Sequence, residues 1–331
     1  MKKHSLINTS TYQQKALAVA IVSMFLSACG GGGGSNGTVP TTATTPTIPA
    51  ATPFTSWSAV TAGSTVVAPG MSQEVTQTTN PTAGKVTGIG IPTAVDTAAS
   101  SFTETLDGNG AITKAIITSP TGSVTFDTAA GDTIGHLIIG TVTDPTTYGA
   151  VKKDQSSLAL AADPSALGWE YQSFGVWSTG RVSGTGSAGV MSVGAPTAGA
   201  AIPTSGTATF TGKSIGFYTD VTGDGHATFS GLTVNANFAN RTLGLSTSGT
   251  IKTHDYVTTS PASNLNLTGT LTYAAGANSF AGTLTNGSTL TGTSSGRFYG
   301  PNAQELGGVF ILQAGSGTPP ETYGGAYGAK R

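Results

Sequence analysis

Three histidines follow the first 28 residues of the chain, and they are the side chains best suited to binding haem iron: His136, His226 and His254. A neutral imidazole or a tyrosine phenolate can ligate that iron. Tyr256 lies two residues after His254, so in an extended segment both side chains would face the same side. The spacing makes His254 and Tyr256 candidate haem ligands, although two exposed loop residues would give the same pattern.

Two stretches match the serine-hydrolase pattern G-x-S-x-G, at residues 212–216 and 292–296. This chemistry needs the serine on a strand-to-helix elbow, beside a histidine and an acid. Both stretches lie in β-patterned sequence with no helix after them, and a chain with 48 glycines produces such matches by chance. We therefore predict that the protein is not an enzyme.

Two glycine-rich stretches also have simple structural interpretations. GTGSAG, residues 184–189, fits G-x-G-x-x-G but has no βαβ unit around it, which argues against dinucleotide binding. DVTGDG, residues 220–225, lacks the spaced acids and the final glutamate of a calcium-binding EF-hand loop. The first stretch indicates a loop and the second a hairpin turn, so we expect neither a resident cofactor nor a metal site.

The N-terminus carries a targeting signal. Three lysines precede the apolar run 16–26, which is too short for a membrane-spanning helix. The sequence Leu-Ser-Ala-Cys that follows resembles the lipobox of bacterial lipoproteins, and Cys29 is the single cysteine of the chain. We expect residues 1–28 to be a signal peptide and Cys29 to be acylated. Gly30 rather than aspartate comes next, which favours the outer membrane in such lipoproteins.

Composition indicates an extracytoplasmic all-β protein. Charged residues make up only 9% of the chain, and threonine, serine and asparagine supply most of its polarity. Without the three signal-peptide lysines, 11 basic residues remain against 15 acidic ones, a formal charge of −4. A slight negative charge of this kind indicates no nucleic-acid partner.

The sequence divides into a tether and two folded regions. Residues 29–53 are rich in Gly, Thr and Pro without apolar periodicity, and we interpret them as a flexible tether beyond the lipidated cysteine. Residues 54–165 contain short β-branched runs between turn signals, which predict a small β-rich domain. DPSALGW, residues 163–169, fits one helical turn or a linker.

Residues 166–331 alternate more clearly. Leu232, Val234, Ala236 and Phe238 point one way with polar residues between them, and similar segments recur about every 8–14 residues. This spacing predicts an antiparallel meander of about eight strands, closed as a barrel. The stretch GRFYGPNAQELGGVF, residues 296–310, fits a barrel corner: a strand end, a helical turn opened by proline, and a strand bent at its two glycines.

Four motifs of the second half occur together in one known family. WEYQSFGVW (169–177), GTATFTGKSIGFY (206–218), the corner at 296–310 and the closing GGAYGAKR resemble the β-barrel domain of transferrin-binding protein B-like surface lipoproteins. In that family a β-rich "handle" domain precedes the barrel, which agrees with residues 54–165. The chain resembles one lobe of the two-lobed family members.

The resemblance implies a function in binding rather than catalysis. Such lipoproteins are held on the outer membrane, usually at the cell surface, and bind a host iron- or haem-carrying protein, or haem. They work with a TonB-dependent outer-membrane receptor. The alternative is an adhesive or immune-evasion surface lipoprotein related to factor H-binding protein. The matching motifs belong to the scaffold, so they do not identify the ligand.

Overall fold

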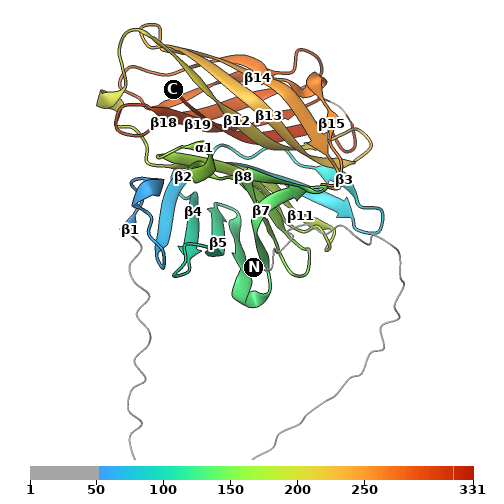
Figure 1. Ribbon diagram of the computed structural model, residues 1–331. Helices are drawn as coiled ribbons and strands as arrows, with labels where there is room; N and C mark the ends of the chain where they lie inside the picture. The colour runs from blue at the N-terminus through green and yellow to red at the C-terminus, as the bar shows by residue number, and fades with distance from the viewer. Residues whose placement is uncertain (1–51, 316) are drawn as a thin grey trace, which may run out of the picture. The chain divides into compact units, whose positions relative to one another are not determined.

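The computed structural model describes residues 52–315 and 317–331, and this part of the protein is built from two sheets whose strands pair antiparallel, apart from one short parallel pair (Figure 1). The predicted signal peptide, residues 1–28, and Cys29 lie outside the described residues, as does the predicted tether up to residue 51. The last two residues of the predicted tether form a short strand, β1 (Thr52–Pro53), that pairs with β2.

The first sheet contains eleven strands and corresponds to the predicted handle. Its main path has the order β6-β5-β4-β2-β11-β10-β9-β8-β7, with β1 and β3 also paired to β2. Neighbours along this path pair antiparallel, and the order ends at β6 and β7, which are adjacent in sequence. The strands after β1 are β2 (Thr65–Asn80), β3 (Lys85–Ile89), β4 (Ser101–Leu106), β5 (Ile112–Ser119), β6 (Gly122–Asp127), β7 (Thr133–Ile139), β8 (Val142–Val151), β9 (Leu158–Ala162), β10 (Gln172–Ser178) and β11 (Thr185–Gly194).

The second sheet closes into an eight-stranded barrel, which confirms the predicted fold class. Its order runs β13-β12-β20-β19-β18-β17-β16-β14, and the pairing of β13 with β14 closes the ring. The short β15 attaches to β14 outside this ring. The strands are β12 (Thr207–Thr219), β13 (Gly225–Asn237), β14 (Thr242–Thr253), β15 (Ser260–Pro261), β16 (Thr268–Thr272), β17 (Ser279–Thr285), β18 (Thr291–Tyr299), β19 (Glu305–Gln313) and β20 (Thr322–Lys330).

Helical structure is sparse in the described residues. The single α-helix is one turn, α1 (Pro164–Leu167), at the position where the sequence allowed a helical turn. Asp163 caps α1 by accepting hydrogen bonds from the amides of Ser165 and Ala166. No helix in the described part of the chain is long and apolar enough to cross a membrane. The 3₁₀ turns are η1 (Trp57–Ala59), η2 (Thr128–Ala130), η3 (Gly199–Ala201) and η4 (Ser263–Leu265).

Strand pairing moves the boundary between the two regions. The sequence placed it between residues 165 and 166, and it assigned the strand near Tyr171 to the barrel. In the structure β10 pairs with β9, and β11 pairs with β2, so residues 172–194 belong to the first sheet. The Asp-Pro and Gly signals around α1 mark a connection between neighbouring strands of one sheet rather than a linker between domains.

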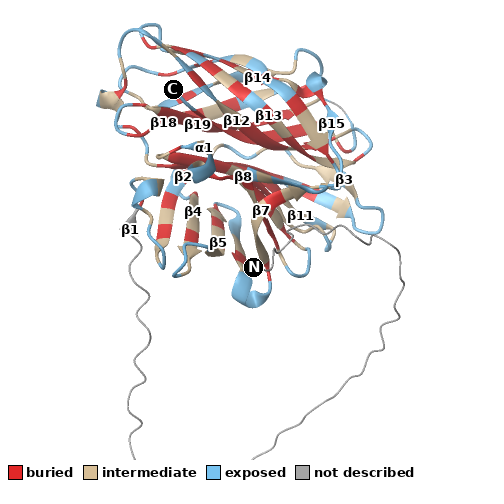
Figure 2. Cartoon of the chain, viewed as in Figure 1, coloured by how far each residue is buried: buried red, intermediate tan, exposed pale blue. Residues whose placement is uncertain are grey.

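The barrel interior is filled by side chains. One buried cluster takes residues from all eight barrel strands, and Phe298 lies within it with no exposed surface. The Phe298 ring contacts four other rings at centroid distances of 5.3 to 6.4 Å. A barrel of this size is filled by side chains or holds one small ligand. Here the aromatic rings occupy the space around Phe298. Buried residues, red in Figure 2, recur along the barrel strands.

The first sheet packs against the outside of the barrel along β12, β19 and β20. In β19, Leu306 and Phe310 belong to the barrel core, while Val309 and Ile311 belong to a second cluster shared with Phe174 of the first sheet. Because alternate residues of a strand face opposite sides, β19 is buried on both faces. This explains why its sequence is a nearly continuous apolar run.

The corner at residues 296–310 joins the two sheets. The Glu305 carboxylate is fully buried and accepts hydrogen bonds from the amides of Glu170 and Tyr171, at 2.7 and 3.0 Å. The Tyr299 and Ser192 hydroxyls are 3.0 Å apart. Residues 300–303 form a turn and not the helical turn that the sequence suggested. The corner therefore serves the scaffold, as the sequence indicated, and it also attaches the barrel to the first sheet.

Candidate binding sites

Five turns of the two sheets converge into one surface, which we call the loop end (Figure 1). It consists of turns 81–84, 140–141, 179–184, 220–224 and 254–259. Backbone hydrogen bonds of 2.8 to 2.9 Å connect turns of the first sheet with one another and with barrel turns, from Val86 to Gly223, Thr79 to Gly184 and Gly140 to Tyr256. The loop end thus combines residues that are far apart in sequence.

The loop end carries most of the exposed large hydrophobic side chains. Five such residues stand out among those that the structure describes, and four lie in these turns or next to them. Their exposed fractions run from 45% to 69%. Scattered exposed apolar residues need no explanation, whereas several together at one place mark candidate interaction surfaces. The four are Val142, Val182, Val221 and Val257.

The predicted haem ligands both lie at the loop end, but in different surroundings. Residues 254–257 form a bend in which Tyr256 has a φ of +58°, so the segment is not extended. His254 is exposed, and its Nδ1 donates a hydrogen bond to the carbonyl of Gly225 at 2.7 Å. Tyr256 packs against the cluster shared with the first sheet, and burial raises the pKa of its phenol to about 12.

His226 is the nearest aromatic partner of His254. Their ring centroids are 5.5 Å apart in an edge-to-face arrangement. Burial lowers the pKa of His226, and the neighbouring Lys252 and His254 lower it further. No group of three or more metal-ligating side chains occurs in residues 52–315 and 317–331. His254 is the exposed imidazole of this pair, whereas both ring nitrogens of His226 are buried. The raised pKa of the Tyr256 phenol makes it ionise less readily than an ordinary tyrosine.

The serines of the two G-x-S-x-G stretches lie inside strands. Ser214, in β12, donates to the carbonyl of Ala326, and the Ser294 hydroxyl in β18 is 2.9 Å from the Tyr327 hydroxyl. Both serines are buried. Neither has the exposed elbow that a serine nucleophile needs. Residues 220–224 form the predicted hairpin turn between β12 and β13, where Asp220 accepts the amide of Asp224.

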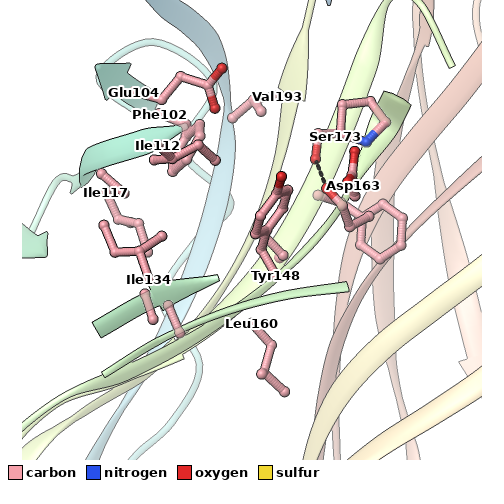
Figure 3. A pocket seen from close by; sticks show the side chains of 18 of the residues that line it. Phe102, Glu104, Ile112, Ile117, Ile134, Tyr148, Leu160, Asp163, Ser173 and Val193 are labelled. Atoms are coloured by element: carbon pink, nitrogen blue, oxygen red, sulfur yellow. Dashed lines mark hydrogen bonds between the residues drawn. The ribbon is translucent and has the colours of Figure 1, made fainter. Parts of the chain in front are cut away.

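The curved first sheet encloses a cavity of about 310 Å³ (Figure 3). Its wall is mostly apolar and aromatic, with side chains from β4, β5, β8, β9, β10 and β11. Exposed residues of the 60–63 and 107–111 turns, Ala62 and Gly110, lie at its edge. The volume is within the range of small-molecule binding pockets. The apolar wall includes Trp57, Phe102, Ile117, Phe126, Phe174 and Trp177.

Three acidic or phenolic groups face this cavity. In Figure 3 the ring of Tyr148 stands between Glu104 and Asp163. Asp163 is partnered: its carboxylate lies 3.0 Å from Nε2 of His136, whose ring stacks on Tyr148. Burial raises the pKa of Glu104 to about 7, and the negative charge of Asp163 adds to the effect. Burial and both carboxylates raise the pKa of Tyr148 to about 12.

Sequence reasoning did not find the cavity acids. Glu104 lies in SFTETL, the sequence of β4. It is two residues from both Phe102 and Leu106, so all three side chains share the face of β4 that lines the cavity. The signal available in the sequence was an acid set between two apolar residues at a spacing of two. Asp163 lies in the stretch that we interpreted as a helical turn or linker. Its sequence context indicates only the capping of α1 and does not show that the residue also lines the cavity.

Comparison with known proteins gives a match for the barrel. Residues 202–331 match a protein-family model described as the C-lobe and N-lobe beta barrels of Tf-binding protein B. The second sheet is therefore similar to the barrels of both lobes of that protein. No curated protein sequence matches this chain.

Solved structures of Tf-binding protein B-like proteins were also found. A single-residue mutant of Transferrin Binding Protein B from Haemophilus parasuis Hp5 is 13% identical, with 80% of this chain and 76% of that chain covered and a TM-score of 0.39. The isotype 1 protein from serogroup B Neisseria meningitidis is 17% identical, with coverages of 70% and 49% and a TM-score of 0.40. A structure named only as a surface lipoprotein is 14% identical, with coverages of 78% and 98% and a TM-score of 0.39.

Proposed function

We propose that the protein is a lipid-anchored binding protein of the outer membrane that binds a host iron- or haem-carrying protein at the loop end. The clustering of four exposed valines in turns of both sheets carries this proposal. The filled barrel interior supports it as well, because a partner then meets the turns rather than the lumen. The names of the similar proteins indicate transferrin as the first partner to test.

The chemistry of the loop end suits a protein partner. Its apolar side chains are valines set among threonines and glycines, and the ion pair between Lys85 and Asp224 is half exposed and so contributes little. The turns also carry the charged side chains of Arg181, Asp220, Asp224 and Asp255, which would belong to the polar rim around the valines, as in other protein interfaces. The bound nutrient would then pass to a TonB-dependent receptor, with the acylated Cys29 holding the protein at the membrane.

The test compares carrier proteins on the full-length protein by surface plasmon resonance. Iron-loaded transferrin, iron-free transferrin and haemoglobin are passed over wild type and over a variant with serine at Val142, Val182, Val221 and Val257. We expect one carrier to bind wild type and to lose at least about 100-fold in affinity on the variant, because burial of four valine side chains contributes hydrophobic free energy that four serines do not. Ile91→Ser is the matched control, because Ile91 is 90% exposed but lies outside the loop end.

Two results would contradict the proposal. Absence of binding by all three carriers would leave the adhesive or immune-evasion alternative in its place. Equal affinity of a carrier for wild type and the four-serine variant would move its site away from the loop end. Membrane fractionation of Cys29→Ser checks the anchor separately: we expect the variant to leave the membrane fraction.

Free haem is tested by titrating the full-length protein with hemin. A Soret band that weakens in His254→Ala, Tyr256→Phe would support these two residues as ligands. A band that persists in that variant and is lost in His226→Ala, His254→Ala would assign the ligation to His226. No Soret change in wild type would exclude free haem as the ligand.

A further inference from the structure

Among the residues that the structure describes, none donates a hydrogen bond to the Glu104 carboxylate. The residue is 8% exposed, and the influences on its carboxyl are burial and the repulsion of Asp163, with no hydrogen bond among them. Buried acids in proteins are normally paired or hydrogen bonded, because an isolated charge in an apolar environment is costly. An unpaired acid on the wall of a cavity of 310 Å³ indicates that its partner is a ligand.

We propose that the cavity of the first sheet binds a small molecule with an apolar body and one protonated amine, which donates hydrogen bonds to the Glu104 carboxylate. This site is independent of the loop end and of the carrier binding proposed there. The apolar body would lie against the aromatic wall, which includes Phe102, Phe126 and Trp177.

The charges that face Glu104 select for a cation. Asp163, at the end of β9, adds a second carboxylate, and Tyr148 on β8 adds a phenol that stays protonated. His136 on β7 is turned to Asp163, with Nε2 at 3.0 Å from its carboxylate, and therefore does not neutralise Glu104. An anionic ligand would meet two carboxylates, and a neutral hydrocarbon would leave Glu104 unpaired. An amine supplies the missing positive charge and the hydrogen-bond donors together.

The amine proposal predicts a dependence on pH. The amine pairs best with ionised Glu104, whose pKa lies near 7 in the empty cavity. Affinity for an amine should therefore rise about tenfold per pH unit below this value and level off above it. A carboxylic acid of the same shape would show the opposite trend, because it binds only when a proton is shared.

The experiment uses three probes with one body: 4-phenylbutylamine, 4-phenylbutanol and 4-phenylbutanoate. Isothermal titration calorimetry with the full-length protein between pH 5.5 and 8.5 gives the affinity of each. We expect the amine to bind tightest at pH 8 and at least tenfold more weakly to Glu104→Gln. Glu74→Gln is the matched control: Glu74 is a buried glutamate on β2 of the same sheet, outside the cavity wall, and it accepts a hydrogen bond from Thr121.

A second variant tests the location without altering charge. Ala115 lies on the cavity wall beside Ile117, and Ala115→Leu should weaken amine binding at least tenfold by filling space. Circular dichroism is used to check that Glu104→Gln and Ala115→Leu are folded. The proposal is overturned if the amine shows no saturable binding, if the alcohol or the carboxylate binds as tightly, or if Glu104→Gln binds the amine as well as wild type does.

Discussion

The barrel and the first sheet are built from similar strands, but one is filled and the other hollow. The barrel closes on itself through β13 and β14, and aromatic rings pack around Phe298 in its interior. The first sheet curls without closing: its order ends at β6 and β7, and its concave side retains a cavity of about 310 Å³. The difference assigns the structural role to the barrel and leaves space for a ligand in the first sheet.

The comparison also shows where polar groups are tolerated. Glu305 is as buried as any barrel residue, yet two backbone amides satisfy its carboxylate. Glu104 in the first sheet is nearly as buried and has no such donors. Two glutamates of similar burial therefore differ in function: one fixes the junction of the two sheets, and the other is available to a ligand.

The largest effect is expected from emptying the filled region. Phe298→Ala removes the ring that four other aromatic rings contact, and it should lower the free energy of unfolding by about 3–5 kcal/mol. Urea denaturation measures the loss. A loss below about 1 kcal/mol would mean that the barrel interior is not the filled region described.

The next effect concerns the unpaired acid. The pKa of Glu104 is about 7 in the folded protein and 4.5 for an ordinary glutamate in water, so wild type loses stability as pH rises from 4.5 to 7. Glu104→Gln removes this loss and should be more stable than wild type by about 3 kcal/mol at pH 8, with almost no gain at pH 4. Denaturation at both pH values checks it. Equal stability at pH 8 would show that Glu104 is paired or solvated.

A smaller effect is expected at the barrel corner. A Cβ at Gly308 would lie 2.5 Å from both the carbonyl oxygen of Ser295 and the hydroxyl of Tyr327, so Gly308→Val should cost about 1–3 kcal/mol. Thermal denaturation measures it against Gly108→Val, where a Cβ meets nothing within 4 Å. Carrier binding should fall only as far as folding falls. A variant with unchanged melting temperature and no carrier binding would make the corner a binding site.

The smallest effect comes from making the same substitution, alanine to leucine, in the cavity of the first sheet and in the barrel core. Ala115→Leu adds atoms to the cavity and should change the free energy of unfolding by less than about 1 kcal/mol. Ala329→Leu adds the same atoms to the barrel core and should cost about 1–3 kcal/mol, as overpacking does. Chemical denaturation of the pair gives both values. Similar costs for the two variants would contradict a hollow first sheet.

The barrel was predictable from sequence because its strands alternate. The period of two through Leu232, Val234 and Ala236 gave the fold class, and the helical turn at DPSALGW was confirmed as α1. The boundary at 165 was wrong because strand order is a long-range property. The pairing of β2 with β11 connects residues over a hundred positions apart, which no local signal reports.

The candidate sites were less predictable. His254 and Tyr256 were paired on the assumption of an extended segment, and a bend at Tyr256 separates their surroundings. The convergence of five turns at the loop end depends on the packing of one sheet against the other. The unpaired state of Glu104 depends on what surrounds it in three dimensions. The period of a strand sequence shows which face a residue occupies, but it does not show whether a hydrogen-bond or ion-pair partner lies on that face.

The last strand, β20, has a consequence for the order in which the protein matures. It lies between β12 and β19, and Ser214 of β12 donates to Ala326 of β20, 112 residues later. Until β20 has been synthesised, both neighbours keep open edges, which are prone to pair with other chains. Closure of the ring must therefore follow synthesis of this strand, and a factor that shields these edges until then would raise the yield of folded protein.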